Sequence, residues 1–288
     1  MIVDAQLHLW GADRAARPWP PGGAALAHRA EPWGAGELIA AMDAAGVDRA
    51  VLVPPSWEGD RNDLALAAAD RHPDRFAVMG RLPLTDRAAA VAWIREVRDR
   101  RAARTAGGRP GPLLLGPRFT FHRPPLRGLL AADELEWLWA ELAASGLPVA
   151  LYPPGRLRAV AAIARRHPGL RLAVDHLALP VDVRGPAAFA ELDDLLALAV
   201  HPNVAVKATC VSASSAQPYP FADTTAVLRR VFDAFGPDRV FWGSDLTRLP
   251  HTYRSCVAHF TRELPFLSGP DRARVMGGAL LDWVGWPA

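Results

Sequence analysis

Short apolar runs alternate with longer helical stretches along the whole of this 288-residue chain. Eight runs have the length and composition of β-strands, and each is followed by a stretch with helical periodicity. Because alternating strands and helices are typical of parallel sheets covered by helices, the pattern predicts an α/β fold, a (β/α)8 TIM barrel with extra C-terminal helices. We expect residues 1–288 to form one such domain, since no linker or repeat interrupts them.

The expected strands are residues 2–7, 49–53, 76–80, 112–121, 148–152, 170–175, 204–208 and 239–242. The expected helices are residues 37–45, 62–71, 87–104, 133–145, 157–166, 187–200 and 224–235, with two more at 252–263 and 270–283. The run 50–53 is apolar throughout, which suits a parallel strand that is buried on both faces. The alternative is an open doubly wound sheet, but that fold needs a glycine-rich phosphate loop after its first strand, and the sequence has none there.

The first strand carries polar side chains on one face. Asp4, Gln6 and His8 alternate with Ala5 and Leu7, and successive side chains of a strand point to opposite sides. Three polar groups on one face fit poorly into a plain apolar core. They fit the mouth of a barrel, where the C-terminal ends of the strands carry the chemistry.

Polar side chains also stand at the ends of later strands. Arg118 lies in the fourth strand, Tyr152 ends the fifth, and Lys207 lies in the seventh. His176 and Asp245 directly follow the sixth and eighth strands. Because the C-terminal ends of all barrel strands meet at one rim, these residues are expected to lie together in an active site.

Three segments at these strand ends resemble signature segments of one protein family. Residues 4–10 read DAQLHLW, residues 175–177 read DHL, and residues 242–245 read WGSD. Together with residues 115–118 and 203–207, they make nearly the whole chain similar to the amidohydrolase-related (amidohydrolase 2) family. That family includes lactonases and aminocarboxymuconate-type decarboxylases. The resemblance implies a distorted TIM barrel with its active site at the C-terminal rim.

The sequence departs from the metal-binding members of that family at two positions. Those members carry a His-x-His pair on the first strand, a His on the fifth and an Asp on the eighth. Here Gln6 stands in place of the first His, and Tyr152 is the nearest match to the fifth-strand His. A neutral amide oxygen and an un-ionised phenol are poor zinc ligands. We therefore expect either no metal or one weakly bound zinc or manganese ion, with His8, His176 and Asp245 as its candidate ligands.

These residues fit the hydrolysis of a small cyclic ester, a lactone, that is acidic or derived from an aromatic compound. Asp245 would act as general base on water. His8, His176 and Tyr152 would donate hydrogen bonds to the carbonyl oxygen as it gains charge. The first alternative is a lyase that decarboxylates an unsaturated or aromatic acid. The second alternative is a barrel that binds a ligand without catalysis.

A further set of residues is expected to bind the substrate: Gln6, Arg118, Tyr152, Lys207, Trp57, Trp10 and His122. Arg118 has two interpretations, because a buried arginine needs either an acidic partner or an anionic ligand. Lys207 has the same two interpretations and fits an ion pair better. Asp175 is expected to be structural, because its side chain points away from that of His176. The long segment 11–36, rich in Pro, Gly and Trp, is expected to be a lid or pocket wall.

Charge and composition disfavour several other classes of protein. The net charge is only +3, and no Lys/Arg run is interleaved with aromatic residues, so we expect no nucleic-acid partner. The two cysteines cannot form a disulfide framework, and no apolar run approaches the roughly 20 residues of a membrane helix. We expect a cytoplasmic protein without a signal peptide or membrane partner, acting on a small molecule. A homo-oligomer is left open.

Overall fold

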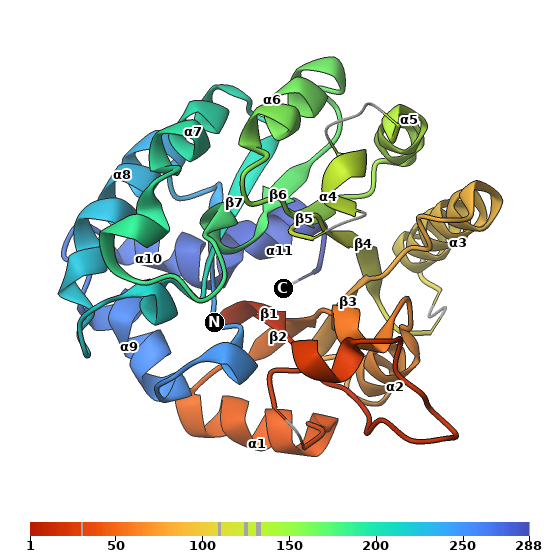
Figure 1. Cartoon of the computed structure of the whole chain (residues 1–288), viewed down its shortest axis with the longest axis horizontal. Coiled ribbons are helices and arrows are strands. Elements are labelled where there is room, and N and C mark those ends of the chain that lie inside the picture. The colour runs from red at the N-terminus through yellow and green to blue at the C-terminus, as the bar shows by residue number, and fades with distance from the viewer. Residues whose placement is uncertain (30, 109–110, 124–125, 131–133, 288) are drawn as a thin grey trace.

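Eight parallel strands pair in sequence order around a nearly closed barrel, and the helices lie outside it (Figure 1). The computed structural model describes residues 1–29, 31–108, 111–123, 126–130 and 134–287. The strands are β1 (Val3–Leu7), β2 (Arg49–Leu52), β3 (Phe76–Gly80), β4 (Leu114–Thr120), β5 (Val149–Tyr152), β6 (Leu172–Val174), β7 (Val204–Thr209) and β8 (Val240–Gly243). The predicted TIM barrel is confirmed.

Helices connect the strands, and further helices follow the last strand. The α-helices are α1 (Ala35–Ala45), α2 (Asp63–Arg71), α3 (Arg87–Thr105), α4 (Leu126–Leu129), α5 (Glu136–Ser145), α6 (Leu157–Arg166), α7 (Leu192–Leu196), α8 (Thr225–Phe235), α9 (Tyr253–Arg262), α10 (Gly269–Ala273) and α11 (Ala279–Val284). Short 3-10 turns follow strands at the rim, among them η2 (Ser56–Glu58), η3 (Asp175–Ala178), η6 (Val211–Ser214) and η8 (Leu246–Arg248). Within the described part of the chain, no helix combines the length and apolar character needed to cross a membrane.

The sixth strand is shorter than the sequence predicts. It ends at Val174, because His176 and Leu177 adopt left-handed φ angles of 56° and 52° and turn the chain into η3. The turn brings the imidazole of His176 to the rim. The first residue of the helix expected at 133–145 lies outside the described residues, and α5 begins at Glu136.

Two expected helices are divided in the structure. The segment expected at 187–200 consists of a 3-10 turn, the short α7 and a second 3-10 turn. The segment expected at 270–283 contains a π-helical turn at Arg274–Gly278 between α10 and α11. In that turn Gly277 approaches β1 so closely that a Cβ atom would lie 2.8 Å from a methyl group of Val3. Hydrophobic periodicity does not reveal such a close approach.

The barrel wall separates an inner apolar cluster from an outer one. Val3 and Ala5 of β1 belong to the inner cluster, whereas Leu7 packs in the larger cluster that includes the surrounding helices. Inward positions on other strands are often alanine, as at Ala77, Ala150, Ala173 and Ala205. Small side chains suit the narrow interior of an eight-stranded barrel.

The side chain of Asp4 joins β1 to the residues that follow β8. Its carboxylate accepts hydrogen bonds from the backbone nitrogens of Gln6 and Ser244, both at 2.9 Å. It also accepts hydrogen bonds from the hydroxyls of Ser244 and Tyr253. The backbone N–H of Asp245 donates to the carbonyl of Gln6 at 3.1 Å. These bonds hold the first and last strands together and place Gln6 beside Asp245 at the rim.

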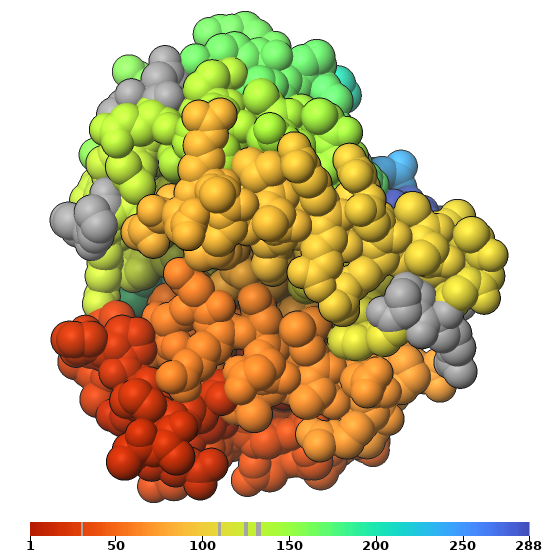
Figure 2. Space-filling model, turned by 90° about the vertical axis from the view of Figure 1, so that its right-hand side faces the viewer, coloured from red at the N-terminus to blue at the C-terminus, as the bar shows by residue number. Residues whose placement is uncertain are grey.

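The segment 11–36 lies against the residues that follow β2. Arg17 binds Glu58 of η2 at 2.9 Å and Asp63 of α2 at 2.5 Å. Figure 2 shows this red N-terminal segment at the molecular surface, beside the orange segment that contains α2. Residues 25–29 line the cavity described below, so part of the segment forms a pocket wall.

Candidate active site

A cavity of about 640 Å³ lies at the C-terminal rim of the barrel, a size that suits a small molecule. Most of the predicted site residues line it: Gln6, His8, Trp57, Arg118, His122, Tyr152, His176 and Asp245. Trp10 and Lys207 are buried but are not part of this lining. The rim therefore brings together side chains from strands that are far apart in the sequence, while two expected substrate contacts lie elsewhere.

The carboxylate of Asp245 is buried beside imidazole rings. The residue is 1% exposed, and within the described residues neither carboxylate oxygen accepts a hydrogen bond. Its neighbours are imidazoles: His8 Nε2 lies 3.0 Å from Oδ1 and His176 Nε2 lies 3.8 Å from Oδ2. Burial alone would raise the pKa of Asp245, but the interaction with the nearby His8 leads the effects that outweigh burial and hold the pKa well below its usual range. The group is therefore ionised.

The protonation of His8 is fixed by its backbone contact. Nδ1 lies 2.6 Å from the carbonyl oxygen of Val53, and a carbonyl only accepts, so Nδ1 carries a proton. Nε2 then faces Asp245 and offers a lone pair when the ring is neutral. When His8 is neutral, His8 and Asp245 could both bind the same cation. When His8 is protonated, the two residues form an ion pair.

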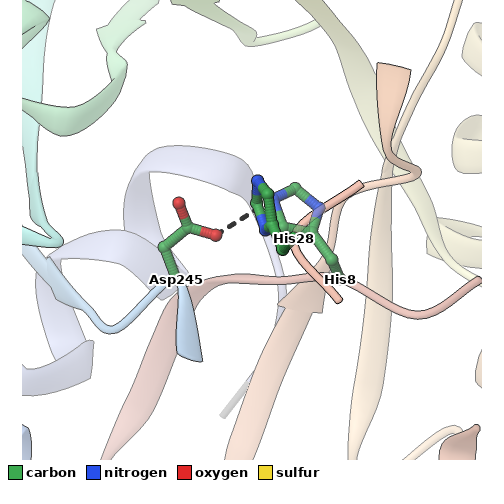
Figure 3. A group of neighbouring side chains, drawn as sticks. All are labelled: His8, His28 and Asp245. Atoms are coloured by element: carbon green, nitrogen blue, oxygen red, sulfur yellow. Dashed lines mark ion pairs between the residues drawn. The ribbon is translucent and has the colours of Figure 1, made fainter. Parts of the chain in front are cut away.

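His28 joins this pair from the segment 11–36, a position that the sequence analysis did not single out. Its Nδ1 lies 2.8 Å from Thr247 Oγ1, and its ring centroid lies 4.5 Å from that of Trp57. Burial lowers the pKa of His28 to about 3, so the ring is neutral at physiological pH. Figure 3 shows His8, His28 and Asp245 converging on one point. The available signal in the sequence was the position of His28 in a segment expected to form a pocket wall.

These three residues have the donor set of a divalent-metal site. One ligand atom from each of His8, His28 and Asp245 lies within 4.8 Å of the others. Two imidazole nitrogens and one carboxylate oxygen suit zinc or manganese, and the unpartnered oxygens of Asp245 fit a bound cation. The predicted set contains His176 instead of His28, and His176 Nε2 lies 3.8 Å from Oδ2 of Asp245.

A chain of polar contacts holds His176 in one tautomer. Lys207 Nζ donates to Gln6 Oε1 at 3.3 Å, which turns the amide nitrogen of Gln6 toward His176 Nε2 at 3.1 Å. Because that nitrogen donates, His176 Nε2 accepts, and the ring proton lies on Nδ1, 2.6 Å from Thr209 Oγ1. His176 is thus positioned as an acceptor at Nε2, contrary to the predicted role of hydrogen-bond donor.

Arg118 and Lys207 share one buried acid, Asp175. Arg118 Nε lies 2.8 Å from Oδ2 and Lys207 Nζ lies 2.9 Å from Oδ1. Burial would raise the pKa of Asp175, but the two cations lower it to about 2. Arg118 also donates to Thr120. Arg118 therefore has an acidic partner in the structure, which is one of its two interpretations. Lys207 forms the ion pair that the sequence favoured.

Two aromatic residues are engaged in ways that limit their predicted roles. The hydroxyl of Tyr152 donates to the carbonyl of Leu179 at 2.6 Å, so its proton is not directed at a substrate. Burial raises the pKa of Tyr152, which keeps the phenol un-ionised and a poor metal ligand. Trp10 packs edge-on against Trp57, with ring centroids 5.4 Å apart, and of these two rings Trp57 lines the cavity.

The chain is similar to known proteins over nearly its whole length. A family model described as amidohydrolase matches residues 3–280. An L-fucono-1,5-lactonase of Burkholderia ambifaria is 31% identical over 293 residues, which cover 96% of this chain and 92% of that protein.

Solved structures share the fold at lower identity. An amidohydrolase of Burkholderia multivorans with bound zinc superimposes with a TM-score of 0.75 at 23% identity, covering 100% of both chains. The 5-carboxyvanillate decarboxylase of Sphingomonas paucimobilis superimposes with a TM-score of 0.65 at 17% identity, covering 99% of this chain and 98% of that chain.

Proposed function

The chain belongs to the amidohydrolase family, and we propose that it hydrolyses a lactone in the cavity at the C-terminal rim. The observation that carries this proposal is the ionised, buried carboxylate of Asp245, which faces the cavity and accepts no hydrogen bond from the described residues. Such a carboxylate can accept a proton from water. The 31% identity to an L-fucono-1,5-lactonase supports the same class of reaction.

Asp245 acts as general base in the proposed reaction. One proton of a water molecule passes to its carboxylate while the water oxygen attacks the carbonyl carbon of the lactone. The carbonyl oxygen becomes an oxyanion, and the ring C–O bond then breaks. The departing ring oxygen takes the proton from Asp245, so that one water is consumed and a hydroxy acid is formed.

Gln6 is positioned to stabilise the oxyanion. One proton of its amide nitrogen binds His176 Nε2, and no other hydrogen bond of this nitrogen occurs among the described residues. The residue lines the cavity, and Lys207 holds its amide orientation. A preorganised side-chain amide in an oxyanion hole contributes about 10²–10³ to kcat.

His8, His28 and Asp245 would hold the divalent metal, if one is part of the enzyme. Such a metal would polarise the lactone carbonyl or lower the pKa of a bound water. His8 could be a ligand in both roles of the metal. Val53 fixes the ring proton on Nδ1, so the lone pair of Nε2 points toward Asp245. We propose zinc or manganese on the basis of the two imidazoles and one carboxylate.

Decarboxylation is the second candidate, because the decarboxylase of Sphingomonas paucimobilis has the same fold. In that reaction His176 or Asp245 would deliver a proton to the carbon atom that loses carbon dioxide. The contacts favour hydrolysis, because Asp245 is held ionised and His176 Nε2 already accepts a hydrogen bond from Gln6. Neither group holds a proton ready for carbon.

The experiment compares purified wild-type protein with Asp245→Asn on two panels of compounds. One panel contains small lactones, and the other contains unsaturated and aromatic carboxylic acids. We expect acid release from lactones, measured with a pH indicator, and its loss in the variant. Release of carbon dioxide without lactone turnover would favour the lyase. Ligand-dependent stabilisation without any turnover would favour a binding protein.

A further inference from the structure

The cavity is much more basic than the protein as a whole. The chain has a net charge of +3. The described residues that line the cavity nevertheless include five arginines and two acidic residues, namely Arg29, Arg118, Arg123, Arg184, Arg248, Asp182 and Asp245. An excess of positive charge on concave walls raises the local concentration of anionic ligands.

Four of these arginines are poorly suited to be the main contact. The guanidinium of Arg118 is already engaged, because it binds Asp175 at 2.8 Å and donates to Thr120. Arg29, Arg123 and Arg184 are exposed, and Arg29 stacks on the ring of Trp33 at 4.7 Å. Water and salt screen charges in such positions.

Arg248 differs from them in burial and in the weakness of its ion pair. Its side chain is 21% exposed, and Asp182, its partner at 3.6 Å, is 89% exposed. Ion pairs with an exposed carboxylate contribute little, so a better-placed anion can compete for the guanidinium. Burial lowers the pKa of Arg248, but Asp245 and other nearby groups raise it more, and the side chain remains charged.

Arg248 is also held close to the proposed general base. It ends η8, and its backbone N–H donates to the carbonyl of Asp245 at 2.8 Å. The backbone positions of Asp245 and Arg248 are therefore roughly 6 Å apart along the turn. After burial, the charge of Arg248 contributes to lowering the pKa of His28 and His122. His28, His122 and Arg248 all line the same cavity.

We propose that Arg248 binds a carboxylate of the substrate, and that the enzyme therefore prefers acidic lactones over neutral ones. The inference rests on the proposed lactone hydrolysis and names its substrate class. The planar guanidinium can donate two parallel hydrogen bonds to a carboxylate. The ring then lies between Arg248 and Asp245, with its carbonyl carbon near Asp245. Arg248 thus takes the anion-binding role that the sequence suggested for Arg118.

The test uses two lactones that differ in charge and hardly in shape, 5-oxotetrahydrofuran-2-carboxylate and its carboxamide. We expect the wild-type enzyme to prefer the carboxylate, and Arg248→Met to lose that preference. Loss of one partner of a desolvated charged pair corresponds to about 10²–10³-fold in kcat/KM for the carboxylate, mostly through KM. Turnover of the carboxamide is expected to fall far less, because its neutral oxygen loses a hydrogen bond but no charge pairing.

Two further variants control this experiment. Arg248→Lys keeps the charge but not the paired donors, and we expect it to restore part of the preference. Arg229→Met removes an arginine on the outer surface of α8, where it is 55% exposed and pairs with Asp233, and should leave the preference unchanged. Equal wild-type turnover of both lactones, or an equal loss of both in Arg248→Met, would overturn the inference.

A binding measurement separates this inference from the proposed function. If no lactone is turned over, lactone hydrolysis is wrong, and calorimetry with pyroglutamate and its neutral counterpart 2-pyrrolidinone decides the role of Arg248. Binding of pyroglutamate that weakens in Arg248→Met supports the anion site. Absence of binding to wild-type protein, or equal binding to both proteins, overturns it.

Discussion

His8 Nε2 lies 3.0 Å from Oδ1 of Asp245, across the line where the first and last strands of the barrel meet. The contact depends on the barrel being nearly closed, since Asp245 also donates its backbone N–H to Gln6 of β1. His8 is oriented by Val53, and the carboxylate oxygens of Asp245 accept no hydrogen bond from the described residues. The pair therefore marks the point where a water molecule or a cation would complete the site.

Replacement of Asp245 by asparagine should remove catalysis and preserve the fold. The amide has the same size but cannot accept the proton of water, and a general base contributes about 10²–10⁴-fold to the rate. The measurement is kcat on the best lactone, with thermal unfolding as the control for folding. Activity within a factor of a few of the wild type would show that another group is the base.

Replacement of His28 by alanine should weaken metal binding. Loss of even an outer-shell partner costs about 10–100-fold in metal affinity, so loss of one of three protein ligands should raise the zinc Kd by at least about 100-fold. Calorimetry with zinc and elemental analysis of the purified protein measure this effect. His122→Ala removes another cavity imidazole and serves as the matched control. Equal zinc affinities in the two variants would exclude His28 as a ligand.

Replacement of Gln6 by leucine should lower kcat with little change in KM. The variant loses a donor that is expected to act on the oxyanion, worth about 10²–10³-fold. It also removes the hydrogen bond that keeps the proton of His176 on Nδ1. Nitrogen-15 NMR of the imidazole should show an Nδ1-protonated ring in the wild type and a changed tautomer ratio in the variant. An Nε2-protonated ring in the wild type would contradict the assigned contact chain.

Replacement of Arg118 by methionine should destabilise the protein more than it changes specificity. Asp175 keeps Lys207 as its partner but loses the hydrogen bond from Arg118, and loss of a hydrogen bond to a charged group costs about 1.5–3 kcal/mol. Chemical denaturation gives the free energy of unfolding, and kcat/KM for the acidic and neutral lactones gives the specificity. Normal stability together with selective loss of acidic substrate would return the anion-binding role to Arg118.

The same cluster predicts a loss of stability in acid. Asp175 has a pKa of about 2 in the folded protein against 3.8 for the ordinary group. Because the folded pKa is the lower one, the contribution is present above pH 3.8 and is lost as the pH falls toward 2. The shift corresponds to about 2 kcal/mol. Unfolding measured from pH 5 to pH 2 should show a smaller acid dependence in Arg118→Met, and an unchanged one would refute the coupling.

The strand-to-helix alternation was sufficient to predict the barrel. Parallel strands are buried on both faces, so they appear in the sequence as continuous apolar runs such as 50–53. The rim residues His8, His176 and Asp245 could also be predicted, because the C-terminal ends of barrel strands converge. These inferences needed only the order of the strands and helices along the chain and the alternation of side chains along each strand.

Two residues of the site could not be predicted in this way. His28 lies in an irregular segment, and Arg248 lies in a short turn after β8. Neither segment has the regular side-chain periodicity of a helix or strand from which the direction of a side chain could be predicted. The first depends on the bonds of Arg17 that attach its segment to Glu58 and α2. Hydrogen bonds between distant segments are not encoded in any local pattern.

The sequence by itself determined the fold class, the rim and the residue types that reach it. Tertiary structure alone decided how those residues are paired. Arg118 could have faced an anion or an acid, and the proximity of Asp175 settled the choice. Gln6 could have replaced a metal ligand, but Lys207 holds its oxygen and turns its nitrogen to His176. The physical reason is that the energy of a buried charge or amide depends on partners a few ångströms away, which the folded chain brings from remote positions.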